Sequence, residues 1–395
     1  MKPVLPDVQY VLRPGVIEFR SGHPDLGLLP AEGLLEATRI VVEREPHKAL
    51  SYGAEQGPDC LLRQLCAWLE REEGAGPPSA EVMITGGASQ ALDMCCMLLT
   101  EPGDLALVQS PTYHLALRVL RDHRLNLVPV PSDDEGLQMD ALEETLMGLQ
   151  EQGGQAKILY LVATFNNPSG VSLNIKRRKG LAALARRFGF TIIEDDVYHQ
   201  LWYDSPPPPS IYSLAAEGSV VRLGSFSKIL APGLRLGWML ASPEIIARCT
   251  KSGVLDSGGG LGHYTAHVVG AFMELGLLDQ HVGRLRAEYA QRRNALMKAL
   301  KEHLPETCHW LTPGGGFFAW LRLPANLDSS ALLPVAEAGG VSYLPGLPFY
   351  ANGGGEPFCR LNFTMWSLED IEEGARRLGL VLHERLAQAP RKKRP

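Results

Sequence analysis

The segment SFSKILAPGLRLGW, residues 225–238, places one lysine between two serines and an arginine seven residues later. A lysine forms a Schiff base with an aldehyde when burial or a nearby cation lowers its pKa enough to leave a free amine. Hydroxyl groups and a bidentate guanidinium are typical ligands of a phosphate. We therefore expect Lys228 to bind a phosphate-bearing aldehyde whose phosphate is held by Ser225, Ser227 and Arg235.

Two further polar segments follow apolar runs. GGASQ, residues 86–90, comes after VMIT and opens a helical pattern, so the backbone N–H groups of Ala88 and Ser89 are expected to face an anion. NNPSG, residues 166–170, ends KILYLVATF and presents Asn167, whose amide can donate to a phenolate oxygen or a carboxylate. Taken alone, each segment is more often a simple turn.

The segment EDDVY, residues 194–198, closes another apolar run with three consecutive acids. A carboxylate at this point can keep a pyridine nitrogen protonated, and Tyr198 can reach a hydroxyl group of the same ring. The structural alternative is a helix N-cap followed by surface acids. The occurrence of all these features in one chain favours a single site over several unrelated turns.

The elements that must position these residues alternate along the chain. Short aliphatic segments, typical of buried strands, are separated by amphipathic helical patterns such as SQALDMCCMLL and KRRKGLAALARRFG. This alternation predicts an α/β fold with a mostly parallel sheet sandwiched by helices, and ligands gather at the carboxyl ends of such strands. The strand segments are EVMITGG, DLALVQSP, KILYLVATFNNPSG, FTIIEDDVY and SVVRLGSFSK.

The pattern changes near residue 270, where a long charged helix precedes the strand-like segments GGFFAWLRL and RLNFTMW. This indicates a second, smaller α+β domain. We predict an N-terminal arm that forms part of the small domain over residues 1–44, a large domain over 45–270 and a C-terminal small domain over 271–395.

Composition limits the partners. The net charge is −6 and the isoelectric point is about 6.0, so we expect no nucleic-acid partner; the basic run RKKRP at the C-terminus reads as a solvated tail. The seven cysteines are scattered without a CxxC pair, and there is no HExxH, which predicts reduced thiols and no metal site. No run reaches the roughly 20 apolar residues of a membrane span, so we expect a cytoplasmic protein with no membrane partner.

With these motifs, the chain resembles the fold-type-I pyridoxal phosphate-dependent aminotransferases of class I/II, in the branch of the 2-aminoadipate, kynurenine and multisubstrate transaminases. The resemblance runs from about VIEFRSGHPDLGLLP to RLNFTMW. It implies pyridoxal 5'-phosphate as cofactor, with Lys228 as the Schiff-base lysine that also moves the substrate proton. Asp195 matches the partner of the pyridine nitrogen, and Asp196 is left as its neighbour. Tyr198 and Asn167 match the pair that bonds the ring hydroxyl.

The resemblance also assigns the remaining positions. The phosphate site takes Gly87, Ala88 and Ser89 together with Ser225, Ser227 and Arg235. Tyr113, in SPTYHLA, matches the aromatic residue that stacks on the ring, although a buried core tyrosine is the alternative. Tyr52, in SYGAEQG, resembles a tyrosine that reaches the partner subunit's phosphate, which implies a homodimer with composite active sites. Arg360, in CRLNFT, matches the arginine that binds the substrate α-carboxylate.

The implied activity is transfer of an amino group between an L-amino acid and a 2-oxo acid by a ping-pong mechanism. Two segments depart from the branch, FRSGHPD at 19–25 and DSGGGLGHYTAHVV at 256–269. Arg20 in the first either meets a distal carboxylate, which favours 2-aminoadipate or glutamate, or bonds to backbone.

These departures keep other functions open, because the residues that hold the cofactor would be unchanged. One alternative is a pyridoxal phosphate-dependent oxidase, lyase or decarboxylase in a biosynthetic pathway. Another is a ligand-sensing domain that binds the cofactor without turnover, as in relatives fused to a winged-helix regulator; the chain is expected to begin directly with the catalytic-type region.

Overall fold

A computed structural model describes residues 12–74, 76–215 and 218–388. Its largest element is an eight-stranded sheet, in which β8, β7, β6, β3 and β4 pair in parallel. β9 is antiparallel to both β2 and β8, and β5 is antiparallel to β4. The predicted α/β class with a mostly parallel sheet is confirmed. In spatial order the strands are β2 (Val82–Thr85), β9 (Gly237–Leu240), β8 (Val220–Ser225), β7 (Thr191–Asp195), β6 (Ala156–Leu161), β3 (Leu105–Ser110), β4 (Asn126–Asp133) and β5 (Gly136–Leu137).

Both faces of this sheet are buried. Successive side chains of a strand point to opposite faces, so each central strand contributes to two apolar clusters. In β6, Ile158 and Tyr160 belong to one apolar cluster, whereas Leu159 and Leu161 belong to another. The first cluster includes side chains of α4 (Ala88–Leu99) and α5 (His114–Asp122). The second includes side chains of α6 (Met139–Glu151), α7 (Ile175–Phe188) and α8 (Ile211–Leu214). Helices therefore cover the sheet on both sides.

The ends of the helices follow local sequence signals. The Asn174 side chain accepts a hydrogen bond from the Arg177 N–H and so caps the start of α7. Gly189, at φ 72°, ends the same helix in the left-handed conformation that favours glycine. Gly74, at φ 78°, ends α3 (Asp59–Glu73) in the same way.

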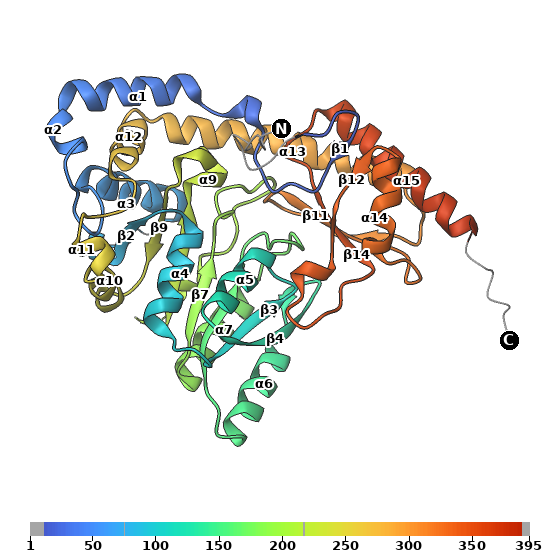
Figure 1. Cartoon of the computed structure of the whole chain (residues 1–395), viewed down its shortest axis with the longest axis horizontal. Helices are drawn as coiled ribbons and strands as arrows, with labels where there is room; N and C mark the ends of the chain where they lie inside the picture. The colour runs from blue at the N-terminus through green and yellow to red at the C-terminus, as the bar shows by residue number, and fades with distance from the viewer. Residues whose placement is uncertain (1–11, 75, 216–217, 389–395) are drawn as a thin grey trace, which may run out of the picture.

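A smaller antiparallel sheet has the order β10 (His309–Trp310), β11 (Phe318–Arg322), β14 (Phe358–Asn362), β13 (Leu344–Pro345). It lies in the part of the molecule that contains α13 (Leu277–His303), α14 (Ser329–Ala338) and α15 (Leu368–Gln388) (Figure 1). α13 and α15 contact each other, so the long charged helix predicted from the sequence packs against the C-terminal helix. This region is the smaller α+β part of the fold.

The N-terminal segment joins both parts. β1 (Ile17–Glu18) pairs in parallel with β12 (Val341–Ser342), while α1 (Ala31–Arg44) contacts α12 (His263–Glu274). Figure 1 shows α1 along one side of the molecule, beside α12. The domain boundaries at residues 44 and 270 remain predictions, and residues 1–11 and the basic tail at 391–395 lie outside the described part. The other helices are α2 (Pro46–Ala49), α9 (Phe226–Ile229), α10 (Pro243–Thr250) and α11 (Gly253–Asp256).

Two expectations drawn from composition concern the cysteines and membrane-spanning helices. All seven cysteines are unpaired. Among the described residues, no helix has both the length and the apolar character that crossing a bilayer requires.

Candidate active site

The carboxyl ends of three neighbouring parallel strands bring the predicted polar residues to one edge of the large sheet. Asn167 follows β6, Asp195 is the last residue of β7, and Ser225 is the last residue of β8. All three are buried. The short helix α9 begins directly after Ser225 and carries Lys228, so the lysine is placed at the same edge.

The Lys228 amine lies in a buried, cationic environment. Its Nζ donates to the Gly22 carbonyl over 2.9 Å and lies 5.5 Å from the centre of the Phe317 ring. Burial, together with the positive charges of Arg360 and Arg235, lowers the pKa of Lys228 to about 8, although Asp195 acts in the opposite direction. A useful fraction of free amine therefore exists near neutral pH, as Schiff-base chemistry requires.

Asp195 has one satisfied and one unsatisfied carboxylate oxygen. The Tyr160 hydroxyl donates to Oδ2 over 2.6 Å, whereas Oδ1 is buried and has no hydrogen-bond partner among the described residues. Burial raises the pKa of Asp195 to about 6, and the Tyr160 bond opposes this rise. A protonated ring nitrogen would complete this half-satisfied carboxylate.

The other two acids of EDDVY have structural partners. Asp196 accepts from the Arg222 Nε over 2.8 Å, and Arg222 also donates two bonds to Glu73 of α3. Glu194 accepts two backbone N–H bonds at the start of α8, over 2.9 and 3.0 Å. Asp196 Oδ1 is also buried without a hydrogen-bond partner, but its carboxylate is paired with Arg222 and His199, whereas the charge of Asp195 acts on Lys228.

The start of α4 presents backbone N–H groups close to Arg235. Gly87, at φ 98°, precedes this helix, which has no side-chain cap, so the N–H groups of Ala88 and Ser89 lack intrahelical acceptors. A Cβ at Gly87 would lie 3.3 Å from Arg235 Nη2, and one at Gly237 would lie 3.1 Å from the Ala88 nitrogen. Two glycines thus allow the guanidinium and the backbone to approach closely. Helix N–H groups facing an arginine can bind a phosphate.

The two predicted serines flank the lysine differently. Ser225 is buried, and its Oγ accepts from the Ser227 N–H over 3.1 Å, which caps α9. Ser227 is half-buried. The Ser225 cap therefore fixes the turn that orients Lys228.

The predicted aromatic residues border the same space. Tyr198 is buried, with its ring centre 5.4 Å from that of Phe317. Tyr113 precedes α5; burial raises the pKa of its hydroxyl to about 12, and the charges of Asp195, Arg360 and Arg235 also act on it. These interactions show that Tyr113 lies near the acid and the two arginines.

Arg360, in β14, is a buried cation bonded to neutral oxygens. It donates to Asn167 Oδ1 over 2.8 Å and to the Arg20 carbonyl over 2.9 Å, and its Cζ lies 3.9 Å from the centre of the Phe318 ring. Burial lowers its pKa to about 10. Within residues 12–74, 76–215 and 218–388, no carboxylate forms an ion pair with it. A buried guanidinium of this kind is suited to a substrate carboxylate.

Two predicted residues are not enclosed. Tyr52 is 90% exposed and packs beside Gly258. The Arg20 side chain is also exposed and forms neither a hydrogen bond nor an ion pair with any described residue, although its charge contributes to lowering the pKa of His114 to about 4, after burial and Arg360. A single chain therefore brings the other predicted residues together but leaves these two at the surface.

Sequence reasoning missed Tyr160, the hydroxyl donor to Asp195. The available signal was a tyrosine in the buried stretch of AKILYL, because a buried phenol requires a hydrogen-bond partner. Its partner could be named only once the pairing of β6 with β7 was known.

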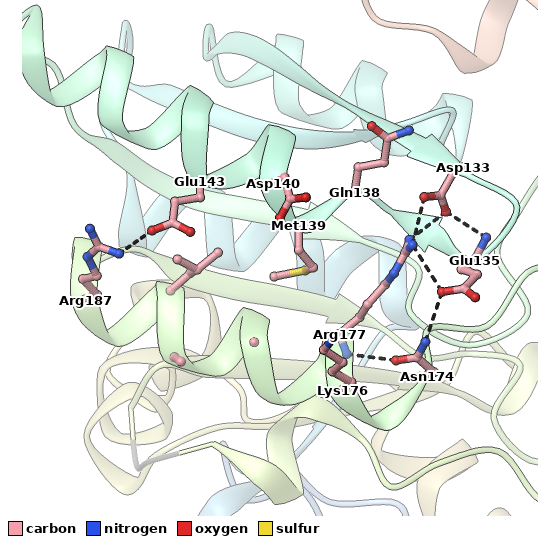
Figure 2. Close-up of a pocket in the computed structure, with 13 residues that line it drawn as sticks. Asp133, Glu135, Gln138, Met139, Asp140, Glu143, Asn174, Lys176, Arg177 and Arg187 are labelled. Atoms are coloured by element: carbon pink, nitrogen blue, oxygen red, sulfur yellow. Dashed lines mark hydrogen bonds and ion pairs between the residues drawn. The ribbon is translucent and has the colours of Figure 1, made fainter.

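A separate hollow of about 670 Å³ lies between α6 and α7, away from these residues (Figure 2). Several of its charged side chains are paired: Arg177 bonds to Asp133 over 2.7 and 2.8 Å, and Arg187 to Glu143. None of the predicted site residues lines it. We assign no chemistry to this hollow.

The observed residues fit pyridoxal phosphate. Asp195 offers an unpartnered buried oxygen to the ring nitrogen, the start of α4 with Arg235 offers an anion site to the phosphate, and Lys228 offers an amine to the aldehyde. The three features meet the three functional groups of one molecule.

Comparison with known proteins supports this assignment. The family model for aminotransferase class I and II matches residues 14–378. An aromatic-amino-acid aminotransferase of Thermococcus litoralis is 36% identical over 94% of this chain and 89% of its own length. A 2-aminoadipate transaminase of Thermus thermophilus is 33% identical over 95% and 92%.

A solved structure is also similar. The kynurenine aminotransferase of Pyrococcus horikoshii, in complex with PMP, has a TM-score of 0.90 and 37% identity, covering 94% of this chain and 92% of the other. These matches favour transamination over oxidase, lyase or decarboxylase chemistry. The chain therefore belongs to the class I and II aminotransferases, pyridoxal phosphate-dependent enzymes that exchange an amino group between an L-amino acid and a 2-oxo acid.

Proposed function

We propose that this aminotransferase acts on substrates with two carboxylates, such as glutamate, 2-aminoadipate and their 2-oxo acids. Arg360 binds the α-carboxylate and Arg20 binds the distal one. The observation that carries the proposal is the pair of arginines: Arg360 is buried without an anion, and its Nη2 bonds to the backbone carbonyl of Arg20, whose own side chain has no partner among the described residues. The name of the 2-aminoadipate transaminase that is 33% identical to the chain gives further support.

When bound, pyridoxal phosphate supplies an electron sink that stabilises negative charge on the substrate Cα. The Lys228 Nζ would take the proton from the substrate Cα and pass it to the cofactor carbon that is joined to the amino nitrogen. Asp195 Oδ1 would accept a hydrogen bond from the N–H of the ring. Burial opposes the charge on Asp195, but a cationic partner restores it.

The remaining residues hold and orient. Tyr198 and the Asn167 amide donate to the ring hydroxyl, which Asn167 can do because its Oδ1 is already occupied by Arg360. Tyr113 stacks on the ring. The phosphate is held by Gly87, Ala88, Ser89, Ser225, Ser227 and Arg235.

We extend the proposal to the assembly and its setting. Tyr52, exposed on one chain, reaches the phosphate site of a second copy, so the enzyme is a homodimer with composite active sites. Unpaired cysteines are typical of a reducing compartment, which supports a cytoplasmic enzyme of amino acid biosynthesis.

The test is a half-reaction of cofactor-loaded enzyme with a panel of amino acids and no acceptor, followed by the absorbance of the bound cofactor. We expect glutamate and 2-aminoadipate to convert the cofactor fastest and 2-oxoglutarate to restore it. Lys228→Ala is the control that abolishes the change. Equal rates with leucine, phenylalanine and glutamate would overturn the two-carboxylate assignment.

A further inference from the structure

Tyr160 is a fully buried residue in the centre of the large sheet, and its hydroxyl donates to Asp195 Oδ2 over 2.6 Å. In the pairing of β6 with β7, Tyr160 lies opposite Ile193. Asp195 is two residues further along β7, so its side chain is on the same face as that of Ile193. The contact is therefore set by the register of two central strands.

This bond determines which oxygen of Asp195 is available. Oδ2 is occupied by the phenol, so Oδ1 is the oxygen left for a ligand, and it is buried without a partner in the described part of the chain. A donor on one oxygen also stabilises the ionised carboxylate, which burial and the neighbouring Asp196 disfavour. Burial raises the pKa of Tyr160 well above its ordinary value, so the phenol remains the donor.

We propose that Tyr160 is a positioning residue that orients Asp195 and keeps it ionised for the ring nitrogen of pyridoxal phosphate. The inference rests on the role proposed above for Asp195. Tyr160 does not touch the reacting atoms, since its effect on the cofactor passes through the carboxylate.

A purely structural role makes a different prediction. The Tyr160 ring belongs to the apolar cluster on one face of the sheet, and Tyr160→Phe preserves that ring while removing only the hydroxyl. Tyr343 provides a matched control: it is also fully buried, and its hydroxyl donates to the Ser329 carbonyl over 2.7 Å in the smaller part of the fold. Tyr343→Phe therefore measures the loss of a buried hydroxyl bond outside the site.

The experiment uses full-length holoenzymes of the wild type, Tyr160→Phe, Asp195→Asn, the double variant and Tyr343→Phe. Equilibrium dialysis against decreasing pyridoxal phosphate gives the cofactor dissociation constant. We expect Tyr160→Phe to raise it about threefold to tenfold, from the loss of one charge-assisted hydrogen bond. Asp195→Asn should raise it more, and adding Tyr160→Phe to Asp195→Asn should change little further, because the phenol acts through the carboxylate.

A second readout is the pH midpoint of the visible absorbance of the holoenzyme. A ring that is less fully protonated withdraws less electron density from Lys228 Nζ in the Schiff base, so the pH midpoint should rise in Tyr160→Phe and stay unchanged in Tyr343→Phe. The titratable groups that act on Asp195 are Tyr160, Asp196, Tyr198, Tyr113 and Lys228, and only the first is altered. If Tyr160→Phe does not fold, Tyr160→Leu, which also removes the hydroxyl and keeps an apolar side chain, replaces it and should shift both readouts in the same directions.

The outcomes separate the two proposals. If Tyr160→Phe matches Tyr343→Phe in both readouts while Asp195→Asn weakens cofactor binding, the inference about Tyr160 fails and the role of Asp195 stands. If Asp195→Asn leaves both readouts unchanged, the proposed role of Asp195 fails, and the inference about Tyr160 with it.

Discussion

The active site has two regions that are built differently. The cofactor floor, formed by Gly87, Asn167, Asp195, Ser225 and Lys228, lies on strand ends and the helices that follow them; Asn167, Asp195 and Ser225 are at most 7% exposed. The proposed substrate cover, formed by residues 20–23, 52–53 and 256–263, consists of segments from different parts of the chain, and its Tyr52 is 90% exposed. The sheet thus determines the geometry of the floor, whereas the cover depends on loops and on what binds beside them.

The largest effect is expected at the floor. Lys228→Ala should reduce turnover more than about 10³-fold, because no other group can take the Cα proton. Steady-state kinetics with glutamate and 2-oxoglutarate would measure it. Lys176→Ala, in the hollow beside α7, is the control and should behave as wild type. Turnover within tenfold of wild type in Lys228→Ala would remove the distinction between the two regions.

Arg360 joins the floor to the cover through its bonds to Asn167 and the Arg20 carbonyl. Replacing it with alanine removes charged hydrogen bonds worth about 1.5–3 kcal/mol each, so KM should rise about 10- to 100-fold for every amino acid. Arg360→Lys should recover part of the loss because it keeps the charge without the bidentate fork. A rise limited to acidic substrates would contradict the assignment of Arg360 to the α-carboxylate.

When the cofactor is absent, the buried carboxylate of Asp195 in the floor should lower the free energy of unfolding. Burial raises the pKa of Asp195 from 3.8 to about 6, so the folded chain binds the carboxyl proton more tightly than the unfolded chain does. This proton binding stabilises the fold below about pH 4, and the stabilisation is lost as the pH rises through about 6. Apoenzyme carrying Asp195→Asn should therefore be more stable than wild type at pH 8, by about 3 kcal/mol, since the shift is about two pKa units and one unit is about 1.4 kcal/mol.

Urea unfolding of the two apoenzymes at pH 8 and at pH 4 measures this difference. It should shrink at pH 4, where the carboxyl is protonated in the folded state and about half protonated in the unfolded state. A wild-type apoenzyme more stable than the variant at pH 8 would mean that the floor is not strained by its buried charge.

At the cover, Arg20→Ala should act selectively. We expect KM for glutamate and 2-aminoadipate to rise about fivefold to tenfold, the range of a partly exposed ion pair with a substrate, while KM for leucine stays constant. Arg186→Ala, on the exposed side of α7, is a matched loss of one surface charge. Parallel changes for all substrates would assign Arg20 a structural role instead.

The smallest effect is expected at Tyr52. Tyr52→Phe should raise the cofactor dissociation constant about threefold, through loss of one hydrogen bond to phosphate, without changing stability. Sedimentation of wild type and variant would show whether both are dimers. A monomeric wild type that binds the cofactor equally well would exclude the composite site.

This contrast also explains what could be predicted from sequence. The floor residues each follow an apolar run, so their order along the chain and their meeting at one sheet edge were foreseeable. Strands β4 and β9 were not predicted: NLVPVPSD contains two prolines, and GWML is only four residues long. Tyr160 and the partners of Arg360 depend on contacts between distant segments, which no local pattern encodes. The position of Tyr52 relative to a second chain likewise cannot be derived from a single chain.

The pairing of Tyr160 with Asp195 has a consequence for how this chain can change length during evolution. Side chains alternate along a strand, so inserting or deleting one residue within 156–161 or 191–195 would move the phenol or the carboxylate to the opposite face of the sheet. The exposed turn at 205–208 can vary in length without this effect, because no strand pairing passes through it. We therefore expect the two central strands to tolerate substitutions but not changes of length, while gains and losses of residues are tolerated in exposed segments such as 205–208.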